Sequence, residues 1–280
     1  MKKTQLFKHF RTMACIFMLL GLSAGTFTLS ASEAITPAEE SGELYLPSDD
    51  AMADVTAAIQ AAKESNKLTL VVMGANWCHD SRGLASRLNQ EPLKSLVDEN
   101  YQTVFVDVGF LSKGKEVITS IGPPVYYATP TVLIIDPVSG QLVNALDRHR
   151  WADAFSISME ESVEYFQRMA ETDLTALRNE RIIPEDLQNL LTEIDAFEQR
   201  QADRLYQAYT ILGPMLEAYK AGDKEAFKDE YWNEIRDFRY KVPADVDGLR
   251  AEVKKRTAAG EGQIDLAYPE YPAFSWEAGN

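Results

Sequence analysis

The sequence predicts an α/β fold, with a mixed sheet flanked by helices, followed by an all-helical C-terminal region. Two apolar runs, 68–73 and 104–108, are separated by a segment of helical spacing, which indicates a parallel strand pair with a right-handed crossover. Two further runs, 131–136 and 142–146, are joined by a short turn and predict an antiparallel hairpin. After Glu171 the apolar spacing is helical only, which marks the change to the second region.

The helices of the first half are indicated by apolar residues three or four positions apart. Asp54 is placed to cap the first helix, and Pro92 is expected to break or kink the second. The run 68–73 is continuous and apolar apart from Thr69, which is typical of a strand covered on both faces. The helices predicted in this half cover residues 54–65, 81–100, 113–121 and 153–170.

The second half is predicted to contain a helical region, 172–258, and an extended tail, 259–280. A long helix passes through 187–216 and is expected to bend at Gly213-Pro214. A further helix covers 224–240 and is expected to end before Pro243, with one more over 246–256. The tail carries aromatic residues among prolines, so we expect an extended arm.

The first 32 residues predict a signal peptide. A start with four basic residues precedes an apolar centre from Met13 to about Leu22, and small residues follow up to Ala34. Because the apolar stretch is short for a membrane span, cleavage is the first reading and an uncleaved anchor is the alternative. We therefore expect a periplasmic or secreted protein. Residues 33–53 are acidic and contain prolines, which predicts an extended lead-in to a domain over 54–171.

Charge and cysteine content narrow the classes of partner. The chain carries 28 Lys and Arg against 43 Asp and Glu, a net charge of −15, which argues against nucleic acid as a partner. Removal of residues 1–32 takes away four basic and no acidic residues and gives −19, a charge that repels anionic lipid surfaces. Of the two cysteines, Cys15 lies in the signal, so Cys78 is the single cysteine of the mature chain. An internal disulfide is thereby excluded.

The segment Trp77-Cys78-His79-Asp80-Ser81 follows the first predicted strand and opens the next helix. At a helix N-terminus the unpaired N–H groups and the helix dipole favour a thiolate over a thiol. His79 and Arg82 could add positive charge near Cys78, and Asp80 would partly oppose it. A thiolate in this position is suited to attack on a disulfide sulfur.

Two segments, Ala75-Asn76-Trp77-Cys78-His79-Asp80-Ser81 and Ala128-Thr129-Pro130-Thr131, together resemble the thioredoxin-like superfamily, here with a Cys-x-x-Ser motif. The resemblance covers roughly residues 54–170. It implies that Cys78 is the attacking thiolate, that Pro130 follows a cis bond and faces the thiol, and that the backbone of Thr129 pairs with an extended client. Two departures are that Ser81 replaces the resolving cysteine and that Val72 stands where the family has a buried acid.

With this resemblance, the sequence predicts thiol–disulfide exchange or isomerisation through one nucleophilic cysteine. Because Ser81 cannot release a bound client, release needs a thiol from the client or from a small molecule. The expected partners are protein or small-molecule thiols and disulfides, without a cofactor or a metal. The predicted catalytic residues are Cys78, Ser81 and Pro130, and the predicted substrate-binding residues are Trp77, His79 and Thr129.

Other readings remain open at this point. The chain could be a non-catalytic binding or adaptor protein that keeps the fold and uses its helical region for contact. Cys78 could be a buried, inert thiol, and Pro130 a trans proline of an edge strand. The loop 147–151 either selects clients or is a solvated loop. A metal site from Cys78, His79 and His149 is a weak alternative, because two of these ligands are adjacent.

Overall fold

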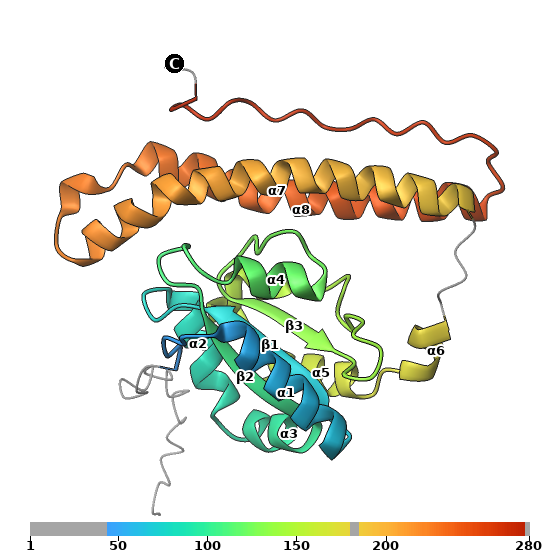
Figure 1. The fold of residues 1–280 in the computed structure, drawn as a ribbon, viewed down its shortest axis with the longest axis horizontal. Coiled ribbons are helices and arrows are strands. Elements are labelled where there is room, and N and C mark those ends of the chain that lie inside the picture. The colour runs from blue at the N-terminus through green and yellow to red at the C-terminus, as the bar shows by residue number, and fades with distance from the viewer. Residues whose placement is uncertain (1–43, 180–184, 278–280) are drawn as a thin grey trace, which may run out of the picture. The chain divides into compact units, whose positions relative to one another are not determined.

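A computed structural model describes residues 44–179 and 185–277. The predicted signal peptide and residues 33–43 of the lead-in lie outside the described residues. Within the described part of the chain, three strands form one mixed sheet in the order β2-β1-β3 (Figure 1). The strands are β1 (Leu68–Gly74), β2 (Tyr101–Asp107) and β3 (Thr131–Ile135). The predicted fold class is confirmed: helices flank this sheet, and long helices follow it.

The central strand β1 determines the order of the sheet. It pairs in parallel with β2, with Leu68 opposite Tyr101, and antiparallel with β3, with Met73 opposite Thr131. All seven residues of β1 are buried, as expected of a strand that is apolar apart from Thr69. Residues of β1 alternate between two core clusters, so that each face of the strand packs against its own set of helices.

Each face of the sheet is covered by different helices. Val71 and Met73 share a core cluster with α1 and α4, whereas Leu70 and Val72 share one with α2, α3 and α5 (Figure 1). Both faces of β1 are therefore covered, and Thr69 is its one polar residue, fully buried. The bounds are α1 Ala51–Ser65, α2 His79–Leu88, α3 Leu93–Asn100, α4 Lys115–Ile121 and α5 Met159–Ala170.

The predicted hairpin is wrong in its second strand. Residues 142–146 form an isolated bridge, Ile135 to Leu142, followed by turns. The reason is the side chain of Asn144, whose Oδ1 accepts a hydrogen bond from the Ile134 N–H (2.8 Å) and whose Nδ2 donates to the Val132 carbonyl (2.9 Å). One buried amide thus occupies the backbone groups that a fourth strand would use.

Capping explains where two helices begin. The helix predicted from residue 54 begins at Ala51, because the Asp50 side chain, rather than Asp54, caps it and accepts from the Ala53 N–H (2.9 Å). The helix predicted over 153–170 begins at Met159, where Ser158 and Glu161 form a capping box. The preceding residues form a short 3₁₀ segment, η1 (Arg150–Ser156).

Long helices dominate the second half, and α7 and α8 run side by side (Figure 1). The prediction that a helix ends before Pro243 is wrong, because α8 continues through this proline. Val242, Pro243 and Val246 are all buried, and burial of apolar surface favours the helical path although a proline cannot donate the helix hydrogen bond. The elements are α6 Leu174–Asn179, α7 Glu185–Lys220, η2 Lys224–Ala226 and α8 Asp229–Ala258, and residues 259–277 carry no regular helix or strand.

Helix α7 packs closely against the loop that follows β2. A side chain at Gly213 would collide with the Phe110 carbonyl oxygen, so this contact requires glycine. The Tyr209 hydroxyl donates to the Tyr126 carbonyl at 2.8 Å. Both contacts join α7 to segments of the sheet domain, and they place the helix beside the residues that precede Pro130.

A buried carboxylate ties α7 and α8 to a loop of the sheet domain. Glu198 on α7 accepts from Arg148 (3.2 Å) and from Arg250 on α8 (2.7 Å), and its side chain is 2% exposed. The hydroxyl of Tyr127 donates to the same carboxylate at 3.4 Å. Two guanidinium groups therefore compensate the charge of one carboxylate that water does not reach.

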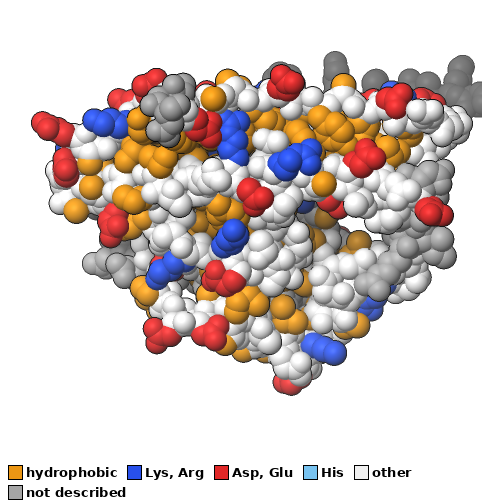
Figure 2. Space-filling model, turned by 45° about the horizontal axis from the view of Figure 1, so that its top comes forward, with side chains coloured by type: hydrophobic (Ala, Val, Ile, Leu, Met, Phe, Trp, Pro, Cys, Tyr) orange, Lys and Arg blue, Asp and Glu red, His pale blue; other side chains and the backbone are white. Residues whose placement is uncertain are grey.

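Acidic and basic side chains are interspersed among hydrophobic ones on the face shown in Figure 2. Over residues 44–179 and 185–277, none of the helices combines the length and the apolar character that crossing a membrane requires.

We expect the substitution Glu198→Gln to lower the free energy of unfolding by about 3–5 kcal/mol, because it leaves the largely buried Arg148 guanidinium without its carboxylate and removes one carboxylate partner of Arg250. Asp195→Asn is the matched control: Asp195 pairs with the same Arg250, but its side chain is 64% exposed. The control should cost less than about 1 kcal/mol. Urea denaturation followed by circular dichroism measures both, and equal losses would contradict the assignment.

Candidate active site

Cys78 lies at the start of α2, directly after the turn that follows β1. It occupies the N-cap position with extended backbone angles, and its N–H donates to the Ala75 carbonyl at 3.0 Å. Its own carbonyl accepts from the Arg82 N–H, the first bond of the helix (3.1 Å). The thiol makes no capping hydrogen bond. The sulfur thus stands next to the first-turn N–H groups of α2 without being bound to them.

The thiol of Cys78 meets the segment that leads into β3. Its Sγ donates to the Thr129 carbonyl at 3.0 Å, and the Thr129 hydroxyl lies 3.5 Å from the same sulfur. The peptide bond between Thr129 and Pro130 is cis. Cys78 is a free cysteine and is 9% exposed. The structure therefore brings Cys78, Thr129 and the start of β3 together at one end of the sheet.

Ser81, in the first turn of α2, is completely buried, and its hydroxyl has no hydrogen-bond partner among the described residues. A Cβ atom at Gly74 would lie 2.7 Å from the Ser81 Oγ, so the end of β1 must be a glycine here. An unpaired buried hydroxyl is unfavourable in itself.

Tyr45, from the predicted lead-in, is a site residue that sequence reasoning missed. Its hydroxyl donates to the Ser81 carbonyl (3.2 Å), and its backbone exchanges two hydrogen bonds with the Asn76 side chain (3.3 and 2.9 Å). The ring packs edge-on against Phe105 at 5.5 Å, and burial raises the pKa of the phenol. The signal in the sequence was the apolar group Leu44-Tyr45-Leu46 within an otherwise acidic segment.

Trp77 and His79, the two other predicted contact residues, hold neighbouring loops. The Trp77 indole donates to the Gly109 carbonyl (2.7 Å) and stacks on Phe110 with ring centres 6.1 Å apart. The His79 ring packs on Phe155 at 3.7 Å. These contacts fix the two sides of the Cys78 turn to the loop after β2 and to η1.

Asp80 accepts a hydrogen bond from the Phe155 N–H at 2.9 Å, and Arg82 donates to the Asn76 carbonyl at 2.8 Å. Asp80 thus binds the backbone of η1, and Arg82 binds the backbone of the turn just before Cys78. Their charges complete the polar surroundings of the N-terminus of α2.

The loop 147–151 is partly buried, with Arg150 exposed and Trp151 in the core. Trp151 is completely buried, Arg148 pairs with Glu198, and the His149 ring packs edge-on against Tyr127 at 5.5 Å. Burial, and then the charges of Arg148 and Arg250, lower the pKa of His149 to about 3. Across the described residues, no three His, Cys, Asp or Glu side chains are grouped as metal ligands.

Comparisons with known proteins give two matches. The profile of a family described as thioredoxin-like matches residues 50–137. The crystal structure of a disulphide isomerase from Xylella fastidiosa Temecula1 is similar at 30% sequence identity and a TM-score of 0.42, over 46% of this chain and 99% of that chain. No curated protein matches the chain.

Removal of the Tyr45 ring should destabilise the protein far more than removal of its hydroxyl. We expect Tyr45→Ala to lower the free energy of unfolding by about 3–5 kcal/mol, because it opens a cavity beside Gly74 and Ser81. Tyr45→Phe should cost about 1 kcal/mol, the value of one hydrogen bond. Urea titrations of both variants provide the measurement, and a loss in Tyr45→Ala no greater than that in Tyr45→Phe would show that the ring is not an anchor.

The lowered pKa of His149 predicts a loss of stability on acidification. Below pH 6.5 the unfolded chain takes up a proton that the folded protein, with a pKa of about 3, does not bind. The free energy of unfolding should therefore fall between pH 6 and 5 by about 1 kcal/mol per pH unit more in the native chain than in His149→Gln. Denaturation curves for the two proteins over this interval measure the difference, and parallel curves would refute the assignment.

Proposed function

Because the chain belongs to the thioredoxin-like superfamily, we propose that it acts in thiol–disulfide exchange or isomerisation through a single nucleophile, Cys78. The observation that carries this proposal is the place of the sulfur, at the N-terminus of α2 and 3.0 Å from the Thr129 carbonyl, beside Pro130. A sulfur in this position has helix N–H groups on one side and an extended segment on the other.

The proposed reaction begins with loss of the thiol proton to solvent. The Sγ then no longer donates to the Thr129 carbonyl, and the first-turn N–H groups of α2 stabilise the negative charge. The thiolate attacks one sulfur of a disulfide. A bond forms between Cys78 Sγ and that sulfur, and the other sulfur leaves as a thiolate, so that no net oxidation occurs.

Ser81 determines how this reaction ends. Its unpartnered hydroxyl is a donor for a thiolate in the first turn of α2, but an oxygen cannot displace the bound client as a second cysteine would. The client is released when another thiol, from the client itself or from a small molecule, attacks the mixed disulfide. This requirement favours isomerisation or monothiol exchange over net oxidation.

The remaining predicted residues are proposed to contact the client. The Thr129 backbone and Pro130 border the sulfur, and Trp77 and His79 form the two sides of the turn. The N-terminal sequence supports an exported protein, in the periplasm or secreted, where disulfides form. Oxidised client proteins are common in such a compartment.

A second candidate function is that of an adaptor that binds other proteins through its helical region. Two observations favour it: Cys78 is only 9% exposed, and hydrophobic side chains are visible on the face shown in Figure 2. An adaptor would keep its partners when Cys78 is replaced by alanine, whereas an exchange protein would lose them.

We expect long-lived mixed disulfides between Cys78 and client proteins in the exporting cell, visible as slower bands on non-reducing gels. Cys78→Ala should abolish these bands, and Ser81→Cys should shorten their lifetime at least about tenfold, because a second thiol can displace the client. Ser81→Ala is the matched control and should leave the bands in place. Bands that persist in Cys78→Ala, or a native thiol that reagents label only after unfolding, would refute the exchange function.

A further inference from the structure

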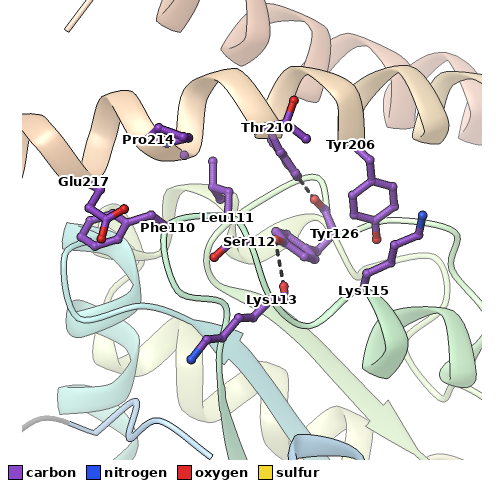
Figure 3. A pocket seen from close by; sticks show the side chains of 12 residues that line it. Phe110, Leu111, Ser112, Lys113, Lys115, Tyr126, Tyr206, Thr210, Pro214 and Glu217 are labelled. Carbon is purple, nitrogen blue, oxygen red and sulfur yellow. Dashed lines mark hydrogen bonds between the residues drawn. The ribbon is translucent and has the colours of Figure 1, made fainter. Parts of the chain in front are cut away.

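A groove of about 390 Å³ lies between α7 and the loop that follows β2, a volume in the range of binding sites (Figure 3). One wall is the face of α7 from Tyr206 to Glu217, and the other includes the segment 110–113 and Tyr126. With a rise of about 1.5 Å per residue, this stretch of α7 is about 16 Å long. That length matches about five residues of extended chain.

The walls of the groove are apolar surfaces with few free donors. Phe110, Leu111 and Pro214 line it, together with two tyrosines whose hydroxyls are already used. The Tyr209 hydroxyl donates to the Tyr126 carbonyl (2.8 Å), and the Tyr126 hydroxyl donates to the Lys113 carbonyl (3.1 Å). These rings therefore offer faces for packing rather than hydrogen bonds.

Tyr206 is different, because its hydroxyl oxygen is buried and has no hydrogen-bond partner in the described chain. Burial, and then nearby charges that include those of Glu116 and Asp203, raise the pKa of this phenol, so it keeps its proton. In Figure 3 its side chain extends from α7 towards the opposite wall, next to Lys115. A neutral donor of this kind needs an acceptor from an occupant of the groove.

The charges around this hydroxyl favour a neutral acceptor. The two lysines that line the groove are engaged, since the Lys115 ammonium lies over the Tyr206 ring at 4.4 Å and Lys113 pairs with Asp107 at 3.8 Å. The carboxylates of Glu116 and Asp203 act on the same phenol and would repel an anion. A backbone carbonyl is a neutral acceptor that an extended peptide presents at every residue.

One end of the groove adjoins the Cys78 turn. Phe110 lines the groove and stacks on Trp77, the residue before Cys78, and the Trp77 indole donates to the Gly109 carbonyl. A chain segment in the groove is thus separated from the turn by a single pair of stacked rings. The groove is therefore positioned to hold one segment of a client while another segment of that client presents a disulfide to Cys78.

We propose that this groove binds an extended, apolar segment of a polypeptide client, with one of its backbone carbonyls accepting from the Tyr206 hydroxyl. The proposal rests on the proposed function and narrows it, because it makes polypeptide disulfides, rather than small-molecule disulfides, the preferred substrates.

The test compares two disulfides that release the same coloured thiol. One is an apolar peptide of about ten residues whose central cysteine carries 2-nitro-5-thiobenzoate, and the other is the symmetrical disulfide of that thiol. With both compounds, Cys78 Sγ bonds to the attacked sulfur and the coloured thiolate leaves. The rate of colour release is measured against the concentration of each disulfide, which gives the half-saturating concentration. The variants are Tyr206→Phe and Thr210→Arg, with Gln207→Arg as control, since Gln207 is exposed on α7 and does not line the groove.

We expect Tyr206→Phe and Thr210→Arg to raise the half-saturating concentration of the peptide roughly three- to tenfold. Both should react with the small disulfide at the rate of the control. Equal effects on the two compounds, or no effect on either, would overturn the groove proposal while leaving exchange intact.

Failure of the proposed function gives a different result: the folded chain releases colour from neither compound, although the unfolded chain does. In that case, fluorescence polarisation with a labelled, cysteine-free version of the peptide measures directly whether the peptide binds in the groove. Binding that Thr210→Arg weakens relative to Gln207→Arg supports a peptide site, and equal or absent binding overturns it.

Discussion

The pairing of β1 with both β2 and β3 is the constraint on which the candidate site depends. Because β1 and β3 are antiparallel with Met73 opposite Thr131, the end of β1 lies next to the start of β3. Cys78 follows the first of these ends and Thr129 precedes the second, so the pairing accounts for their 3.0 Å contact. A shift of one residue in this register would turn the side chains of β3 to the opposite face and separate the two segments.

The helical region also binds the segment that precedes Thr129. Tyr209 on α7 donates to the Tyr126 carbonyl, and Arg239 on α8 donates to the Tyr127 carbonyl, so both helices hold the chain just before Thr129. Glu198 adds a buried charge to this connection through Arg148. The long helices therefore contribute to the position of the thiol's partner, which is a reason to treat them as part of the site rather than as an appendage.

Much of this arrangement could be predicted from sequence, because its signals are local. The apolar run of β1 and the change to helical spacing each follow from residues close together in the chain. The predictions that were wrong depend on contacts that the local sequence does not show. The Asn144 side chain binds the edge of β3 where a fourth strand was predicted. Helix α8 continues through Pro243, which is buried in the folded protein. Tyr45 was missed for the same reason, since its partners Asn76 and Ser81 lie more than 30 positions away.

The hydrogen bond from the Cys78 thiol to the Thr129 carbonyl also bears on how exchange would be controlled. This carbonyl is part of the extended backbone that a client strand would pair with in strand addition. A client N–H that approaches it competes with the thiol for the same oxygen. As the thiol loses its acceptor, the protonated form loses the stabilisation of that hydrogen bond. Client binding and release of the thiol from its hydrogen bond would then be coupled through one backbone oxygen.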